Sequence, residues 1–186
     1  SIIHNSVGKV FEEKHYEPKI VKQYDFISIR GNLDGSKYCV DIINELAMNN
    51  PDLRFLIIGR GEFFDHFKKA KNVTWIDKVL KHEEMIKFLN QSKCGLLLTR
   101  QDTQGVMTCE MATFGLPVIT SDIAVCHEIL DDFDNVELIN NDNTNIDLKP
   151  ILEKLIKGIP YKKNEKYFSI NTCGAEVKLY KNLLRE

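Results

Sequence analysis

Short apolar runs of strand length alternate along the chain with stretches of helical period. The expected strands are residues 26–30, 54–58, 73–76, 95–99, 117–120 and 136–139. The expected helices are residues 38–49, 62–70, 82–89, 107–114, 124–130, 151–157 and 173–184. Almost continuously apolar strands separated by helices predict a parallel sheet that is covered on both faces. With right-handed crossovers this is an α/β fold, a Rossmann-like, doubly wound parallel sheet of about six strands.

Length and charge exclude several classes of protein. The 186 residues suffice for one domain and are few for two. A formal net charge of -2 excludes a generally basic surface for nucleic acid. No apolar run approaches the roughly 18 residues of a membrane-spanning helix. Five cysteines without a C-x-x-C pair or a histidine at ligand spacing argue against a zinc site and indicate buried free thiols.

The loop after the first expected strand reads RGNLDGSK, from Arg30 to Lys37. In a doubly wound sheet the ligand lies outside the carboxyl ends of the strands, so this loop belongs to the candidate site. Its glycines, among them Gly31, let the backbone approach a ligand, and Arg30 and Lys37 bring positive charge before a helix N-terminus. The loop predicts a diphosphate cradle, with an exposed turn carrying two solvated cations as the alternative. A second glycine turn, at Gly59, is weak evidence for a ligand site because many such turns need glycine for steric reasons.

The most informative segment reads TRQDTQGVMTCEMATFGLPV. At the expected helix start, backbone N–H groups of Gly105, Val106 and Met107 would meet an anion. Glu110 lies about one turn further, where a carboxylate would repel an anion but could accept hydrogen bonds from a ribose diol. The alternative is an ordinary helix with a favourable charge at Asp102 and an exposed Glu110. His66, His82 and His127 have no partner at triad spacing and are expected at the surface or at helix ends.

The D-x7-E pattern followed by F-G-L-P-V resembles the E-x7-E motif of retaining glycosyltransferases with the GT-B fold. It is most similar to family 4, the glycosyltransferases of group 1. The matching positions are Asp102, Gly105, Glu110, Gly115, Pro117 and Val118.

Four further segments resemble motifs of the same family in the same order. The loop from Arg30 to Lys37 resembles its G-R-L…K-G donor-diphosphate loop. FLIIGRGE at 55–62 resembles L-x-I-x-G-x-G-P, and NVTWIDKV at 72–79 resembles the N-V-x-F-x-G-x-V segment that borders the base. NSVGKVF at 5–11 resembles the N-G-V-D-x-x-x-F linker between the two halves of these enzymes. The likeness therefore runs along nearly the whole chain.

The resemblance implies a role for each matching residue. Arg30 and Lys37 would neutralise the diphosphate leaving group, and Asp102 would contact hydroxyls of the donor sugar; these are the expected catalytic residues. The expected donor-binding residues are Glu110 for the ribose, Gly105, Val106 and Met107 for the phosphate, Gly31 and Gly59 in the glycine turns, and Lys78 and Val79 for the base. No metal and no cofactor are implied, and the donor would be a UDP- or GDP-linked sugar.

The resemblance also implies the organisation of the protein. Residues 1–186 would form a single donor-binding domain, the C-terminal half of a GT-B glycosyltransferase, with 1–24 as interdomain linker region and 165–186 as closing C-terminal helix. A missing N-terminal domain would bind a glycan or lipid-linked acceptor, so the isolated fragment would be inactive.

The implied setting is surface polysaccharide biosynthesis, such as that of capsule, in the cytoplasm. The full-length enzyme would make a peripheral contact with the inner face of the membrane, and no nucleic acid would be a partner. Two alternatives stay open. One is a GT-B-type nucleotide-sugar epimerase, and the other is a non-catalytic Rossmann-like domain that binds a nucleotide-sugar or a partner protein.

Overall fold

A six-stranded parallel sheet forms the centre of the protein, seen in a computed structural model that describes residues 4–157 and 163–184. Its strands are β1 (Tyr24–Asn32), β2 (Phe55–Arg60), β3 (Val73–Ile76), β4 (Ser92–Leu97), β5 (Val118–Ser121) and β6 (Val136–Ile139). They lie in the order β3-β2-β1-β4-β5-β6, and each neighbouring pair is parallel. The predicted α/β, doubly wound sheet is confirmed. The strand order reverses between β1 and β4, which is where such sheets form a ligand crevice.

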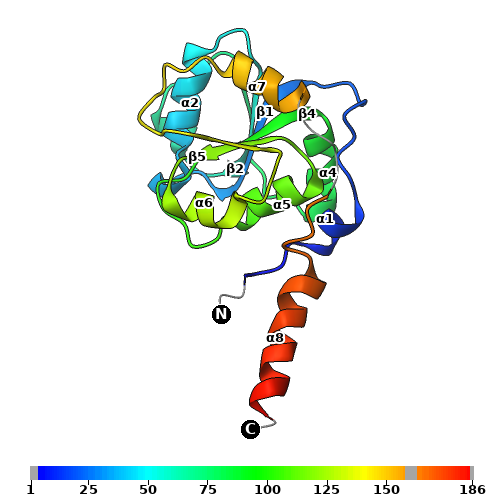
Figure 1. Cartoon of the computed structure of the whole chain (residues 1–186). Helices are drawn as coiled ribbons and strands as arrows, with labels where there is room; N and C mark the ends of the chain where they lie inside the picture. Colours follow the sequence, from blue (N-terminus) through cyan, green and yellow to red (C-terminus); the bar gives the residue numbers. More distant parts are fainter. Residues whose placement is uncertain (1–3, 158–162, 185–186) are drawn as a thin grey trace.

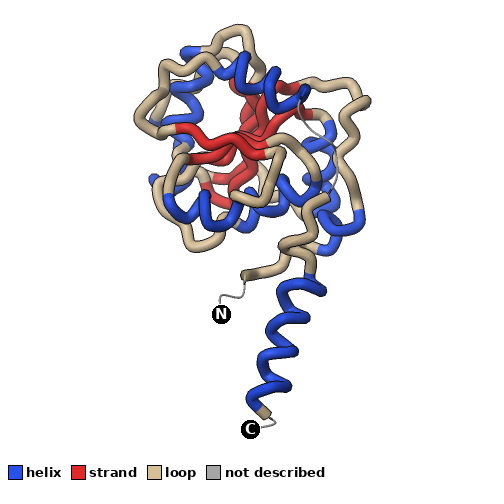
Figure 2. Tube along the Cα trace, in the orientation of Figure 1, coloured by secondary structure: helices blue, strands red, loops and turns tan. Residues whose placement is uncertain are grey.

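Helices cover both faces of this sheet (Figures 1 and 2). One face carries α2 (Val40–Asn49), which follows the 3-10 turn η1 (Ser36–Tyr38), and α7 (Leu148–Lys157). The other face carries α1 (Lys9–Glu13), α4 (His82–Asn90), α5 (Val106–Phe114) and α6 (Ala124–Leu130).

The central strands contain runs of apolar residues because each of these strands faces two cores. In β1, Ile27 and Ile29 belong to the core beneath α4 and α5, whereas Phe26 belongs to the core beneath α2. All three side chains are almost fully buried. A strand covered on both faces needs apolar residues at successive positions, which explains the uninterrupted runs in the sequence.

The prediction of a helix over residues 62–70 is wrong in its length. Only α3 (Phe63–His66) is helical, and the backbone is extended at Phe67 (φ -119°, ψ 136°). The phenylalanines of this segment pack on one another: the Phe63 ring stacks on Phe67 at 4.7 Å and meets Phe64 edge-on at 5.1 Å. The three phenylalanines therefore serve local aromatic packing around a short helical turn. Their spacing in the sequence had suggested one face of a longer helix.

The first part of the chain contributes to the core, although residues 1–24 were expected as a linker region. Val7, Val10, Phe11 and Tyr16 are buried with the side chains beneath α4 and α5. Helix α1 packs against α5. Residues 7–16 therefore pack on the domain.

Helix α8 (Ser169–Leu183) projects away from the rest of the domain (Figure 1). Thr172 is its one buried residue, while Val177, Tyr180 and Leu183 are exposed. The expected closing helix thus exists but lies apart from the sheet. None of the described helices combines the length and the hydropathy that crossing a membrane would require.

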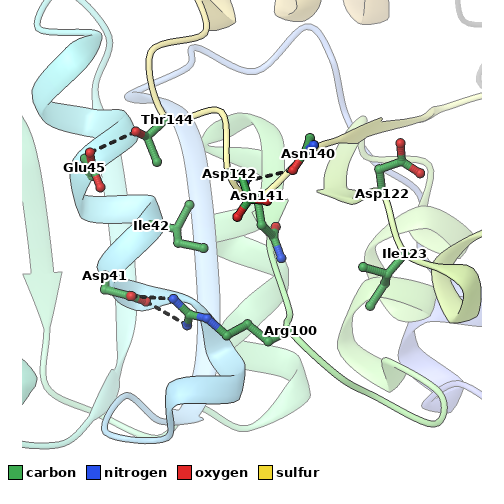
Figure 3. Close-up of a pocket in the computed structure, with 10 residues that line it drawn as sticks. All are labelled: Asp41, Ile42, Glu45, Arg100, Asp122, Ile123, Asn140, Asn141, Asp142 and Thr144. Atoms are coloured by element: carbon green, nitrogen blue, oxygen red, sulfur yellow. Dashed lines mark hydrogen bonds and ion pairs between the residues drawn. The ribbon is translucent and has the colours of Figure 1, made fainter.

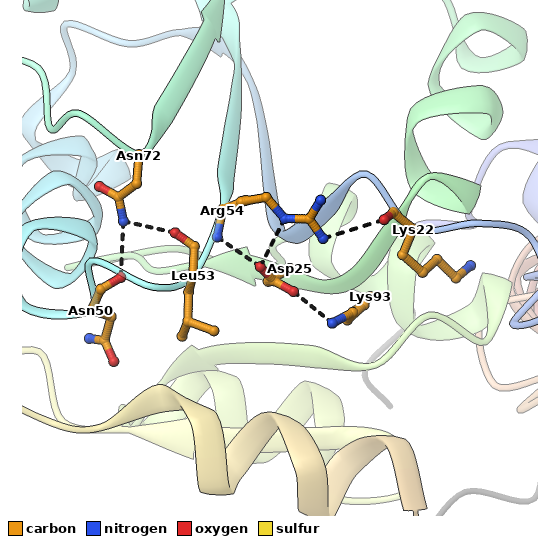
Figure 4. A network of polar contacts seen from close by, with 7 residues as sticks. All are labelled: Lys22, Asp25, Asn50, Leu53, Arg54, Asn72 and Lys93. Carbon is orange, nitrogen blue, oxygen red and sulfur yellow. Dashed lines mark hydrogen bonds and ion pairs between the residues drawn. The ribbon is translucent and has the colours of Figure 1, made fainter.

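A polar network fixes the starts of the strands (Figure 4). Buried Asp25 accepts a hydrogen bond from the backbone N–H of Arg54 at 2.8 Å and forms ion pairs with Arg54 Nε at 3.4 Å and Lys93 Nζ at 2.7 Å. The side-chain amide of Asn72 donates to three carbonyl groups at 2.8–2.9 Å, one in the last turn of α2 and two in the segment between α2 and β2. These contacts hold β1, β2 and β4 in register, so the carboxyl ends of the same strands have fixed positions.

Candidate functional site

Arg30 lies at the switch point of the sheet, near the end of β1. It is 8% exposed, and its Nη2 donates to the carbonyl of Leu98 at 2.7 Å, just beyond β4. Its Nε is buried and has no hydrogen-bond partner among the residues that the structure describes. Burial lowers the pKa of Arg30, and the nearby Asp102 carboxylate opposes that effect. Because a buried unsatisfied donor costs about 1–3 kcal/mol, this guanidinium is suited to binding an anion.

Tyr38 brings the two predicted cations together. The guanidinium carbon of Arg30 lies 5.2 Å from the centre of the Tyr38 ring, and Nζ of Lys37 lies 4.7 Å from it. An aromatic face attracts cations, so one ring partly offsets the repulsion between two like charges. Lys37 is exposed on η1, beside the crevice.

Asp102 lies beside this pair, in the loop between β4 and α5. Its Oδ1 accepts a hydrogen bond from the backbone N–H of Thr103 at 2.8 Å, and the residue is exposed. A Cβ atom added at Gly105 would lie 3.4 Å from its Oδ2, so the carboxylate is adjacent to the start of α5. We call Arg30, Lys37, Tyr38 and Asp102 the Arg30 cluster.

Helix α5 begins next to the Arg30 cluster. Gly105 is its N-cap and makes no side-chain hydrogen bond to the helix, and the first turn has no acidic residue. The first N–H groups of a helix lack acceptors within it, so those of Val106 and Met107 are available at this end. The helix start at which a phosphate is expected therefore lies beside the Arg30 cluster.

Glu110 lies five residues into α5 and is buried, with 6% of its side chain exposed. Its Oε1 accepts a hydrogen bond from the backbone N–H of Gly8 at 3.0 Å, and His82 Nε2 lies 3.5 Å from the same oxygen. Burial raises the pKa of Glu110, an effect that the Gly8 N–H and His82 oppose. The alternative of an exposed Glu110 on an ordinary helix is therefore wrong.

Gly8, His82 and Glu110, which we call the Glu110 cluster, come from three separate elements. A Cβ atom at Gly8 would lie 2.6 Å from His82 Nδ1 and 3.2 Å from Glu110 Oε1, so this close approach requires glycine. The sequence reasoning missed the part that His82 and Gly8 play here. No local signal could have identified them, because their proximity arises only from the packing of α1 and α4 on α5.

Lys78 and Val79 lie between β3 and the Glu110 cluster. Nζ of Lys78 pairs with Glu84 of α4, and its backbone N–H donates to the carbonyl of Ile76 at 2.9 Å. Val79 is exposed. Both residues belong to the segment that leads from β3 to α4, whose first residue is His82.

Helix α5 joins the two clusters. Gly105 caps it beside Asp102, and Glu110 follows five residues later. At a rise of about 1.5 Å per residue, the two positions are roughly 7.5 Å apart along the helix axis. One helix thus carries free backbone N–H groups at its start and a buried carboxylate at a fixed spacing.

The two predicted glycines differ in their surroundings. A Cβ atom at Gly31 would meet no atom within 4 Å, so the backbone there is open to approach. At Gly59 a Cβ atom would lie 2.4 Å from the carbonyl oxygen of Arg30 and 2.8 Å from Leu33 Cδ2. Gly59 is therefore required by the close packing of the β1 end on β2.

A hollow of about 670 Å³ lies at the same edge of the sheet, between α2 and the ends of β5 and β6 (Figure 3). It includes none of the predicted donor-binding residues. Arg100, one of its lining residues, forms ion pairs with Asp41 at 2.6 and 3.1 Å. The backbone N–H of Arg100 also donates to the carbonyl of Lys37 at 3.0 Å. These bonds anchor the loop that carries Asp102 to η1 and α2.

Asn141 anchors the same loop from the other side of the hollow. Its side chain accepts a hydrogen bond from Ser121 Oγ at 2.7 Å and donates to the carbonyl of Thr99 at 3.0 Å. Within residues 4–157 and 163–184, no group of three His, Cys, Asp or Glu side chains is placed to hold a metal ion.

Residues 26–157 match the family described as "Glycosyl transferases group 1". No curated protein sequence matches the chain.

Several solved structures share the fold at low sequence identity. AviGT4, a glycosyltransferase involved in avilamycin A biosynthesis, has a TM-score of 0.71 and 15% identity, over 99% of this chain and 57% of its own. Sucrose-phosphate synthase from Thermosynechococcus elongatus has a TM-score of 0.78 and 12% identity, over 100% of this chain and 53% of its own. WaaG, a glycosyltransferase involved in lipopolysaccharide biosynthesis, has a TM-score of 0.70 and 16% identity, over 95% of this chain and 55% of its own. The chain thus spans little more than half the length of these proteins.

Proposed function

The chain belongs to the glycosyl transferases of group 1, and on that premise we propose that it is the donor-binding half of a retaining glycosyltransferase of the GT-B type. It binds a UDP- or GDP-linked sugar at the carboxyl edge of its sheet. The observation that carries this proposal is the buried guanidinium of Arg30, whose Nε has no partner among the described residues, at the switch point between β1 and β4.

The diphosphate lies against the Arg30 cluster and the start of α5. Transfer breaks the bond between the anomeric carbon and the diphosphate oxygen, and negative charge develops on the leaving group. The anomeric carbon forms a new bond to a hydroxyl oxygen of the acceptor, and the proton of that hydroxyl passes to the departing diphosphate. Arg30, Lys37 and the N–H groups at the helix start stabilise that charge in the transition state. We propose that transfer is independent of metal because these groups provide the positive charge. Asp102 accepts a hydrogen bond from a hydroxyl of the donor sugar.

The nucleoside lies toward the Glu110 cluster. The Glu110 carboxylate accepts hydrogen bonds from the ribose diol, and backbone groups of Lys78 and Val79 contact the base. The fixed spacing along α5 supports this orientation, because it separates an anion-binding helix end from a carboxylate that would repel phosphate.

The acceptor is bound by a second domain, and transfer takes place in the cleft between the two. Support for a second domain is that the chain covers 57% of AviGT4 and 55% of WaaG. We propose a glycan or lipid-linked acceptor, surface polysaccharide biosynthesis as the pathway, and the cytoplasmic face of a membrane as the location. WaaG, with its part in lipopolysaccharide biosynthesis, supports this setting.

Calorimetric titration with UDP, GDP and ADP, together with thermal unfolding, tests the proposal. One of the uridine or guanosine nucleotides should raise the melting temperature, since a ligand at 100 times its Kd stabilises by about 2.7 kcal/mol. Arg30→Lys should weaken that binding, because an ammonium cannot reproduce the guanidinium geometry. The matched control is Arg54→Lys, at the opposite edge of the sheet, which should bind as the wild type does. If no diphosphate binds at millimolar concentration, the proposal is wrong and a domain that binds only a partner protein is favoured.

A further inference from the structure

His82 has no part in the proposed chemistry, yet it faces the buried carboxylate on which nucleoside binding depends. We infer that His82 is a positioning residue for the donor, which holds the Glu110 carboxylate charged and oriented toward the ribose hydroxyls. The inference rests on the proposed function, in which Glu110 binds the ribose.

The two oxygens of Glu110 have different surroundings. Oε1 accepts the Gly8 N–H at 3.0 Å and has His82 Nε2 at 3.5 Å. Oε2 has no hydrogen-bond partner among the described residues, and it is not among the side-chain atoms found both buried and unpartnered. The protein thus anchors one oxygen and leaves the other unpartnered and not completely buried, an arrangement suited to orienting a carboxylate toward a ligand.

The electrostatics of the cluster support the same role. Burial disfavours the charged form of Glu110, and the nearby His82 imidazole opposes that effect. The only other titratable group that interacts with Glu110 in the described residues is Cys109 of α5, a thiol whose pKa burial raises to about 12. Cys109 is therefore neutral near pH 7. A charged carboxylate is a stronger acceptor than a protonated one for both hydroxyls of a ribose.

His82 can be replaced without removing the start of α4. The N-terminus of that helix is capped by Glu84, whose Oε2 accepts the backbone N–H of Lys81 at 2.9 Å. The His82 side chain is half exposed, and its ring meets Phe11 edge-on at 5.3 Å. Loss of the imidazole therefore changes the environment of Glu110 more than it changes the packing of the helix.

The test measures Kd by calorimetry from pH 5 to pH 8, with whichever of UDP and GDP binds the wild type. His82→Ala should weaken binding about tenfold at pH 7, equivalent to part of a charge-assisted hydrogen bond. The pH at which binding is lost on acidification should move upward, because the Glu110 carboxylate has lost a favourable charge. His82→Lys, which restores a cation, should return this pH toward the wild-type value.

His66→Ala is the matched control, because His66 Nε2 faces a carboxylate of Glu62 at 3.7 Å on the exposed surface. It should change neither the affinity nor the pH profile. A wild-type pH profile in His82→Ala, with binding lost in Glu110→Gln, overturns the inference and leaves the proposed function standing. Undiminished binding by Glu110→Gln overturns the ribose assignment and the inference together. A changed melting temperature in His82→Ala, with no change in the pH profile of binding, also counts against the inference.

Discussion

The backbone N–H of Gly8 donates to the carboxylate of Glu110 at 3.0 Å, across a separation of 102 residues. Gly8 lies outside residues 26–157, the part that matches the glycosyl transferase family. The segment before α1 therefore forms part of the wall around the proposed nucleoside position, and the geometry of the Glu110 cluster depends on both ends of this long-range bond.

Substituting Gly8 by alanine should weaken nucleotide binding. The added Cβ would lie 2.6 Å from His82 Nδ1, so the half-exposed imidazole must move away and the Glu110 cluster loosens. We expect an affinity for UDP or GDP about three- to tenfold lower, with a small change in melting temperature. Gly174→Ala in α8, where a Cβ atom would meet nothing within 4 Å, is the control and should bind normally. Equal affinities in the two variants would contradict the prediction.

Glu110→Gln should raise the stability of the unliganded protein at pH 7 while abolishing most nucleotide binding. Burial raises the pKa of Glu110, so the folded protein binds its proton more tightly than the unfolded chain does. The charged carboxylate therefore destabilises the fold progressively as the pH rises above the ordinary value of 4.5. A glutamine still accepts the Gly8 N–H and carries no charge. Urea unfolding at pH 7 and pH 4 should show a gain that shrinks at the lower pH, and a loss of stability at pH 7 would refute this account.

The sequence indicated those features that depend on local pattern. The sheet could be predicted because strands buried on both faces have uninterrupted apolar runs, such as Phe55–Ile58 in β2. The positions of Arg30 and Asp102 followed from the rule that ligands lie at the carboxyl ends of strands. The burial of Glu110 and its contact with His82 could not be predicted, because they depend on where α4 packs on α5.

Asp25→Asn should destabilise the protein by about 1–3 kcal/mol at pH 7. Burial alone would raise the pKa of Asp25, but the bonds from Lys93 and Arg54 outweigh it and hold the pKa below its ordinary value. The carboxylate therefore stabilises the fold above that value of 3.8, and this contribution is lost as the pH falls through the folded-state pKa. The difference from the wild type in unfolding free energy should accordingly be greatest near neutrality. A difference that grows on acidification would contradict this assignment.

Arg100→Gln should affect donor binding more than stability. Arg100 ties the loop that carries Asp102 to Asp41 of α2 and to the carbonyl of Ser36. The ion pair is about half exposed, so its loss should cost no more than about 1 kcal/mol in unfolding free energy. Affinity for the nucleotide-sugar should fall several-fold as the loop becomes less ordered. Lys154→Gln on α7, which breaks the ion pair with Glu137 of β6, is the control and should leave affinity unchanged.

Gly59→Ala should destabilise the domain rather than act on the ligand directly. The added Cβ would lie 2.4 Å from the carbonyl oxygen of Arg30, and a backbone atom inside a paired strand cannot move aside as a side chain can. We expect a loss of about 1–3 kcal/mol, typical of overpacking in a core. Gly31→Ala, where a Cβ atom meets nothing within 4 Å, should fold with near wild-type stability in the same urea titration. The added Cβ would push β1 and β2 apart at Arg30. Any loss of nucleotide affinity in Gly59→Ala should therefore accompany the loss of stability. Weakened binding with unchanged stability would instead mean that Gly59 contacts the donor.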